Sequence, residues 1–169
     1  MFEPLPKLID PWHAVDAALE LTGSLPLERM VRLGDVLREH QGDVKCHLFF
    51  SRDAEGRGLI SGTIRARLEL SCQRCLEAVT QDFELHPHLS LVSGMDEARL
   101  LPAELDPLLV TEELISLPDI IEDELLLALP QIPMHDPGDC PRGAEGAKVE
   151  KMAGESQGIH PFAILGALK

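Results

Sequence analysis

The hydrophobic pattern is most regular over residues 60–91, where two long alternating runs flank a short turn. Period-two alternation of apolar and polar side chains is typical of strands with one buried and one solvent-exposed face. The sequence therefore predicts a long two-stranded ribbon with Cys72-Gln73-Arg74-Cys75 at its tip. The positions of the apolar parity are Ile60, Gly62, Ile64, Ala66, Leu68 and Leu70 before the turn, and Val79, Phe83, Leu85, Leu89 and Leu91 after it.

Strand and helix patterns also precede the ribbon, separated by short turns. Because the strand at 44–51 and the two runs of the ribbon follow one another with short connections, we expect an antiparallel β-meander of three strands. The fold class predicted is α+β: a β-meander, strongly twisted or barrel-like, with flanking helices. The elements expected before the ribbon are an edge strand at 4–10, a helix at 11–18 with Asp10 as its N-cap, a strand at 19–25, a helix at 27–39 and a strand at 44–51.

After the ribbon, the pattern predicts a loop with one helical turn over 93–106 and a short strand over 108–112. A helix is expected over 120–129, with Asp119 as N-cap and Glu122 completing a capping box. This helix is apolar almost all round, so we expect it to be buried against the sheet. Pro130 ends it.

The chain divides into one α+β domain over 1–134, a flexible linker over 135–159 rich in Gly, Pro and charged residues, and a short amphipathic helix over 160–169. Phe162 and Leu165 lie on one face of that terminal helix. Two readings stay open for it. It docks back on its own domain, or it is a peptide-like ligand for a groove on a partner.

Composition narrows the possible classes. Of the 169 residues, 44% are hydrophobic, which is enough for a core, and no apolar run approaches the roughly 20 residues that a membrane span needs. The first residues lack the basic and apolar regions of a signal peptide, so we expect a cytoplasmic protein. In that compartment the four cysteines serve as thiols or metal ligands rather than disulfides.

The net charge of −14 is unevenly distributed. Residues 93–124 carry ten acidic side chains and one basic, whereas residues 43–75 carry six basic and four acidic. An acidic chain is a poor nonspecific nucleic-acid binder, which favours protein partners or a small basic face. The candidate contact residues are Arg65, Arg67 and Arg74 on the ribbon and Glu122, Asp123 and Glu124 on the last helix. For both sets the alternative is a solvated surface.

The cysteines carry the clearest candidate chemistry. Cys72 and Cys75 have ligand spacing, and His135 with Cys140 supplies a second pair, so the four fit a Cys3His zinc site. Two alternatives stay open: plain buried or turn cysteines without metal, and a redox or zinc-dependent protein centred on the Cys-x-x-Cys. Cys46 has an inward parity and is expected to be a core thiol. Phosphate loops, nucleophile elbows and metalloprotease motifs are absent from the sequence, which gives no positive argument for an enzyme or a small-molecule substrate.

Several motifs together resemble one protein family, the YceD family of bacterial large ribosomal RNA subunit accumulation proteins. The motifs are Cys72-Gln73-Arg74-Cys75-Leu76-Glu77, then Glu122 to Pro130, then Pro133-x-His135, and finally Pro161 to Lys169. The resemblance implies a cytoplasmic, non-enzymatic factor for synthesis, processing or stability of large-subunit (23S) ribosomal RNA. Some members carry more cysteines near residues 135–140, resembling a zinc ribbon, and this sequence keeps His135 and Cys140 there.

Charge and resemblance together give a binding hypothesis. Arg65, Arg67 and Arg74 would face large-subunit ribosomal RNA or its precursor particle. The acidic segment 93–124 would face a basic ribosomal or processing protein, because complementary potentials favour encounter.

Overall fold

The computed structural model describes residues 4–140, so the expected linker beyond 140 and the terminal helix with Phe162 and Leu165 lie outside the described residues. The elements, in chain order, are β1 (Leu8–Ile9), α1 (Pro11–Asp16), β2 (Glu20–Pro26), a 3₁₀ turn η1 (Leu27–Arg29), α2 (Val31–Gly34), β3 (Asp43–Arg52), β4 (Gly58–Ser71), β5 (Ala78–Leu85), β6 (His88–Val92), α3 (Met95–Ala98), β7 (Asp106–Leu109), β8 (Ile115–Ser116) and α4 (Leu117–Ala128).

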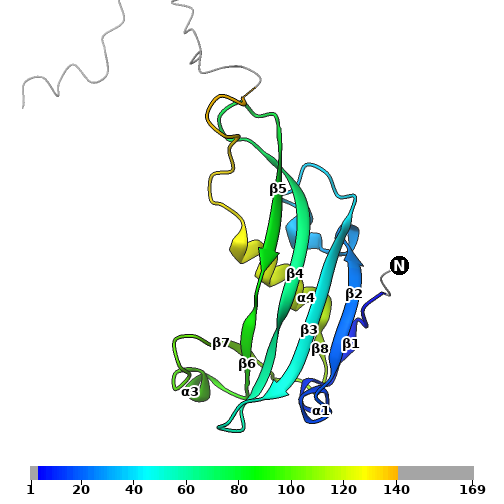
Figure 1. The fold of residues 1–169 in the computed structure, drawn as a ribbon, viewed down its shortest axis with the longest axis vertical. Coiled ribbons are helices and arrows are strands. Elements are labelled where there is room, and N and C mark those ends of the chain that lie inside the picture. The colour runs from blue at the N-terminus through cyan, green and yellow to red at the C-terminus, as the bar shows by residue number, and fades with distance from the viewer. Residues whose placement is uncertain (1–3, 141–169) are drawn as a thin grey trace, which may run out of the picture.

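The main sheet is built on the central strand β4. Within the described residues its order is β2-β3-β4-β6-β7, with β5 also paired to β4. Strands β3, β4 and β5 form the expected meander, and every pairing in this sheet is antiparallel except that of β6 with β7. The sheet stays open rather than closing into a barrel. Figure 1 shows the β4–β5 turn at one end of the long axis and α1 and α3 at the other. The α+β class is confirmed.

The returning run of the ribbon is two strands rather than one. The start of β4 pairs with β6, and its second half, from Ile64 onward, pairs with β5. The change of partner falls near Gly62, whose φ is +155° and where a Cβ would lie only 2.0 Å from the His47 carbonyl oxygen. On the returning run, Pro87 is buried between β5 and β6 and cannot donate to a ladder. Glycine and proline therefore place the bend that separates the two ends of the sheet.

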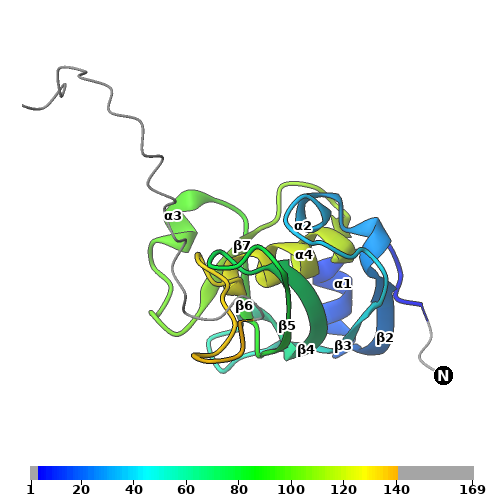
Figure 2. The same cartoon turned by 90° about the horizontal axis from the view of Figure 1, so that it is seen from above.

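Helices α1, α2 and α4 lie on the same face of the sheet (Figure 2). The apolar parity of β4 forms the core on that face, as expected, and α4 contributes Leu117, Ile121 and Leu125, which are completely buried. The opposite face of β4 carries polar side chains, Arg65 and Arg67 among them. Two layers, sheet and helices, thus enclose one aliphatic core.

The prediction of a single helix over 27–39 is wrong. The structure has the 3₁₀ turn η1, a non-helical Met30 and the four-residue α2 instead. The apolar residues Leu27, Met30 and Leu33 recur every three positions and are all buried. A spacing of three brings side chains into line in a 3₁₀ turn, whereas an α-helix would spread them around its axis.

Helix α4 begins earlier than expected, and the expected capping box is wrong. Its N-cap is Ser116, whose Oγ accepts from the backbone N–H of Asp119 at 3.4 Å, and Pro118 lies in the first turn. The helix is also not buried all round, since Leu127 is 84% exposed. Smaller differences concern two strands: the edge strand shrinks to Leu8–Ile9, and β7 lies at Asp106–Leu109 rather than 108–112. The Asp10 cap is confirmed, with its carboxylate accepting from the His13 N–H at 3.0 Å.

Candidate metal centre and charged surfaces

The Cys-x-x-Cys turn between β4 and β5 is held by its own backbone. The Leu76 N–H donates to the Cys72 carbonyl at 2.8 Å, and the Cys72 N–H donates to the Glu77 carbonyl at 2.9 Å. Leu76 takes a left-handed conformation, with φ of 65°, which costs a non-glycine residue roughly 1–2 kcal/mol. Both cysteines are buried although the turn is at the end of the molecule. The local backbone thus aims the two sulfur atoms inward.

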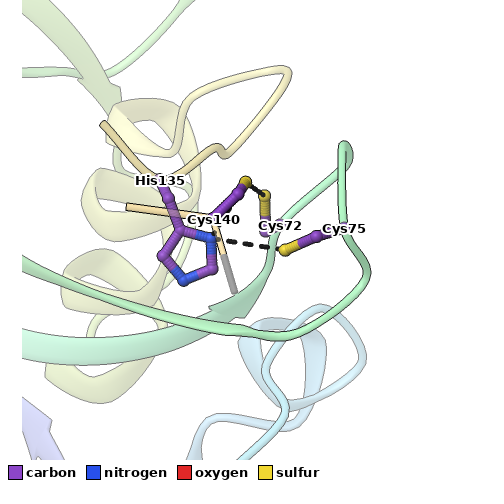
Figure 3. Close-up of side chains that lie close together, drawn as sticks. All are labelled: Cys72, Cys75, His135 and Cys140. Carbon is purple, nitrogen blue, oxygen red and sulfur yellow. Dashed lines mark hydrogen bonds between the residues drawn. The ribbon is translucent and has the colours of Figure 1, made fainter. Parts of the chain in front are cut away.

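A second segment, at 133–140, closes over this turn. The Gln73 N–H donates to the Pro133 carbonyl at 2.8 Å, and the Arg74 guanidinium donates to the carbonyls of His135 and Asp136 at 3.2 and 3.3 Å. These bonds bring side chains from segments about 60 residues apart into one cluster (Figure 3). The structure thereby brings together all four metal-ligand residues expected from the sequence, Cys72, Cys75, His135 and Cys140.

The spacing within this cluster fits a tetrahedral ion. One ligand atom from each residue lies within 4.8 Å of the others. The Sγ atoms of Cys72 and Cys140 are 3.9 Å apart, and His135 Nδ1 lies 3.5 Å from Cys75 Sγ and 3.7 Å from Cys140 Sγ. Ordinary Zn–S and Zn–N bonds give tetrahedral edges of roughly 3.8 Å between sulfurs and roughly 3.6 Å between sulfur and nitrogen. The donor set and its distances therefore suit Zn²⁺.

Groups around the four ligands orient them further. The other ring nitrogen of His135, Nε2, lies 2.8 Å from the Ala78 carbonyl. A proton on Nε2 donated to that carbonyl leaves the Nδ1 lone pair for a metal, the arrangement typical of zinc-bound histidines. The Arg74 Nε–H donates to Cys140 Sγ at 2.9 Å. Three thiolates around Zn²⁺ carry a net charge of −1, which the Arg74 guanidinium offsets.

Cys72 of the cluster differs in acidity from the isolated Cys46. Burial by itself would raise the pKa of Cys72, but N–H groups of Cys75, His135 and Arg74 donate to its sulfur and lower the pKa to about 5. Burial and the neighbouring sulfurs raise the pKa of Cys75, and the hydrogen bond with Cys72 raises the pKa of His135. Cys46 is a core thiol, as expected, and burial raises its pKa to about 12.

The redox alternative finds less support in this geometry. In dithiol oxidoreductases the Cys-x-x-Cys opens a helix, which lowers the pKa of the first thiol, whereas here strands β4 and β5 flank the motif. Three sulfurs and an imidazole nitrogen converge on one point, where a redox pair needs two sulfurs. The geometry of the cluster therefore favours a metal centre over a redox pair.

The three arginines expected to act together are divided between two places. Arg65 and Arg67 lie on the exposed face of β4, where each faces an acid of β5: Arg65 donates to Glu84 at 2.8 Å, and Arg67 lies 3.9 Å from Asp82. Arg74 lies at the tip and takes part in the cysteine cluster. The exposed sheet face is consequently balanced in charge rather than strongly basic.

The three consecutive acids of α4 point in different directions. Glu122 is only 4% exposed. Its Oε1 accepts from the Leu33 N–H at 2.9 Å, and its Oε2 accepts from Arg32 at 3.0 Å. Asp123 is exposed and also pairs with Arg32. Glu122 therefore joins α4 to α2, a role with no local signal in the sequence because the partners are about 90 residues apart.

Glu124 faces the opposite way, into a groove of about 860 Å³ formed by the end of β5, the β5–β6 connection, β6, β7 and α4, which we call the α4 groove. Burial, together with the nearby carboxylates of Asp106 and Asp123, raises the pKa of Glu124 above its ordinary value. The features expected from the sequence did not include this groove. The sequence signal that indicates it is the apolar pattern around the whole circumference of α4. The sheet covers only one side of such a helix, so apolar side chains such as Leu127 stay exposed on another side.

Within residues 4–140, no helix has both the length and the apolar character that a membrane span requires.

The comparisons with known proteins agree with these motifs. The family described as large ribosomal RNA subunit accumulation protein YceD matches residues 60–169, which include the whole cysteine cluster. A protein of that name from Haemophilus influenzae is 31% identical over 170 residues, an alignment that covers 98% of this chain and 96% of the relative. No solved structure matches the chain. The chain therefore belongs to the YceD family of large ribosomal RNA subunit accumulation proteins.

Proposed function

We propose that this protein supports the synthesis, processing or stability of large-subunit ribosomal RNA by binding, without catalysing a reaction, and that it does so in the cytoplasm. Family membership supports the connection with large-subunit ribosomal RNA. The observation that carries the binding mode is the charge on the described surface, where acids outnumber bases and the arginines of the exposed sheet face lie opposite carboxylates. Such a surface suits a basic protein of the precursor particle better than naked RNA.

The acidic segment 93–124 and the exposed acids of α4 are the proposed contact with that basic protein. Asp123 and Glu124 are its candidates on α4, whereas the buried Glu122 holds the two helices together. Residues Phe162 and Leu165 of the terminal segment stay a proposed partner contact of their own. Deleting residues 160–169 and repeating the association experiment below would show whether they contribute.

A direct RNA contact at Arg65 and Arg67 is the secondary part of the proposal. Exposed ion pairs are worth roughly 0–1 kcal/mol, so phosphates could displace Glu84 and Asp82 at little cost. Replacing both arginines by glutamine should then weaken binding to precursor RNA. The matched control replaces Arg29 and Arg52, which removes the same charge from other elements.

The metal centre is proposed to be structural. Cys72, Cys75, His135 and Cys140 would hold Zn²⁺, which would join the end of the ribbon to the segment leading toward the C-terminus. A closed four-ligand set leaves no open position for a substrate or an activated water, unlike catalytic zinc sites. Arg74 and the Ala78 carbonyl would orient the ligands.

The decisive experiment is association with large-subunit precursors in growing cells. Tagged full-length protein should co-sediment with pre-large-subunit particles at low salt and in part at moderate salt, and its depletion should lower 23S relative to 16S ribosomal RNA. Because the proposed contacts are largely electrostatic, binding should weaken as salt rises. Absence of co-sedimentation at both salt concentrations would overturn the binding model.

A further inference from the structure

The α4 groove combines apolar walls with an acidic rim. Its apolar lining comes from three strands and one helix: Leu85, Leu89, Pro107, Leu108, Ile120, Leu126 and Leu127 are among the side chains that form it. Leu127 is the most exposed of these leucines, at 84%. A leucine that projects from a packed helix beside an open groove is typical of a binding surface rather than of a core.

The ionisable side chains that line the groove are four carboxylates and one imidazole, and no lysine or arginine is among the described lining residues. Glu84 pairs with Arg65, and Asp123 pairs with Arg32. The two other acids, Asp106 and Glu124, have no ion pair with a described lysine or arginine, and they are close enough to influence one another. Asp106 is exposed and Glu124 is partly buried, and like charges placed near one another at such a site are unfavourable until a cation separates them.

We infer that the α4 groove binds a basic, amphipathic segment of a partner protein. A lysine or arginine of that segment lies between Asp106 and Glu124, and its apolar side chains pack against Leu126 and Leu127. The inference deepens the proposed function and rests on it for the class of partner, a basic protein of the precursor particle. It goes further by placing the contact in one groove and by giving the chemistry of the segment.

Charge distinguishes this occupant from the alternatives. RNA would bring phosphates against Asp106 and Glu124, which repel them. Residues 160–169 of the chain itself contain several apolar side chains, which match the apolar walls of the groove. They contain only one lysine and no arginine, which is a poor match for its acidic rim. Both alternatives become outcomes of the test.

The test places a photo-crosslinking amino acid at Leu127 of the otherwise unaltered full-length protein in growing cells. The control carries the same residue at Val31, which is 75% exposed and lies outside the groove and outside segment 93–124. Mass spectrometry of the cross-linked peptides identifies what lies against each position. We expect a cross-link specific to position 127, to a peptide with several lysines or arginines and alternating or clustered apolar residues.

A charge variant sharpens this test. The double substitution D106N/E124Q keeps the shape of the groove and removes its two unpaired charges, and it should reduce the position-127 cross-link at least about tenfold, the loss expected when a cation loses its carboxylate partners. The matched control, D35N/E28Q, removes one aspartate and one glutamate from exposed positions outside the groove. It should leave the cross-link unchanged.

Several results would overturn the inference. They are a cross-link at position 127 no stronger than at Val31, a cross-linked peptide that is acidic, a cross-link to RNA, or one to residues 160–169. Equal loss with both charge variants would also contradict it, because net charge and not the groove would then matter. The proposed function is tested separately: if co-sedimentation with the precursor persists while the cross-link fails, the groove assignment is wrong and the function stands. If co-sedimentation fails, the proposed function is wrong whatever the cross-link shows.

Discussion

The ionisable side chains at the tip of the ribbon and those in the α4 groove differ in whether the described chain supplies them with partners. At the tip, Arg74 donates to a sulfur and two carbonyls, and His135 has partners at both ring nitrogens. In the groove, Asp106 and Glu124 both line the walls without a described cationic partner, and a leucine projects into solvent. A region in which every polar group is satisfied contributes to stability. A region that leaves charges and apolar surface unsatisfied is adapted to something that is not part of the chain.

Helix α4 contains the same contrast within one turn. Glu122 is buried and accepts from Leu33 and Arg32, so it stabilises the contact between α4 and α2. Glu124, two residues later, lies on the groove side beside like charges. Two residues of one type at nearly the same height of a helix thus have opposite consequences for stability, which mutations can measure.

The largest effect is expected from the tip. Replacing both Cys72 and Cys75 with serine removes two ligands, so bound zinc should fall from about one per chain to near zero and Tm should fall more than in any other variant below, because metal-binding free energy is coupled to folding. Metal analysis of protein purified without chelator, with thermal melts, measures both. C46A is the control: it also removes a buried thiol, yet the zinc content should not change. A zinc content well below one per chain in the unaltered protein would contradict the proposed metal centre.

The second effect concerns Glu122. E122A should lower the free energy of unfolding by about 1–3 kcal/mol, because it leaves the buried Leu33 N–H without an acceptor and removes the buried carboxylate that pairs with the half-exposed Arg32. Denaturant unfolding at neutral pH measures the loss. D123A, at the exposed neighbouring position, should change stability by less than about 0.5 kcal/mol. Equal effects of the two substitutions would show that Glu122 does not have the structural role assigned to it.

The third effect concerns Arg74, which contacts Cys140 but is not itself a proposed metal ligand. R74M should weaken zinc binding about tenfold, as removal of groups that support metal ligands commonly does. Competition with a chromophoric chelator gives the affinity. R65M removes the same charge from the middle of β4, away from the tip, and should leave the affinity unchanged. Similar losses in both variants would mean that overall charge, and not the Arg74–Cys140 contact, holds the metal.

The smallest effect, and the one of opposite sign, is expected in the groove. E124Q should stabilise the isolated protein by less than about 1 kcal/mol at pH 7, since the folded protein raises the pKa of Glu124 and ionisation there opposes folding. Below the ordinary glutamate pKa both states are protonated, so the gain should vanish near pH 4. As pH rises through the raised pKa, the stability of the unaltered protein should fall relative to E124Q. Thermal melts at several pH values follow this difference, and destabilisation at pH 7 would contradict the unpaired state of Glu124.

Local sequence patterns predicted the strands well and the helices less well. Alternation in β3 and β4 identified both the strands and their buried faces, because a strand sorts its side chains by parity alone. The helix expected over 27–39 failed because burial of Leu27, Met30 and Leu33 at a spacing of three is satisfied by a 3₁₀ turn. The cap of α4 was misplaced because Asp119 and Glu122 fit a capping box, while Pro118 allows the helix to begin a turn earlier.

The sequence by itself determined the meander, the inward parity of the core and the four candidate metal-ligand residues, since strand alternation and the short Cys-x-x-Cys and His-x4-Cys spacings are local properties. Only the tertiary structure decided that His135 and Cys140 reach the turn, that Arg74 supports a sulfur, and that Glu122 and Glu124 have opposite environments. These depend on contacts between residues 60 to 90 positions apart, for which a local pattern carries no information. The α4 groove belongs to this second group, because its lining comes from β5, the β5–β6 connection, β6, β7 and α4 and exists only once they pack together.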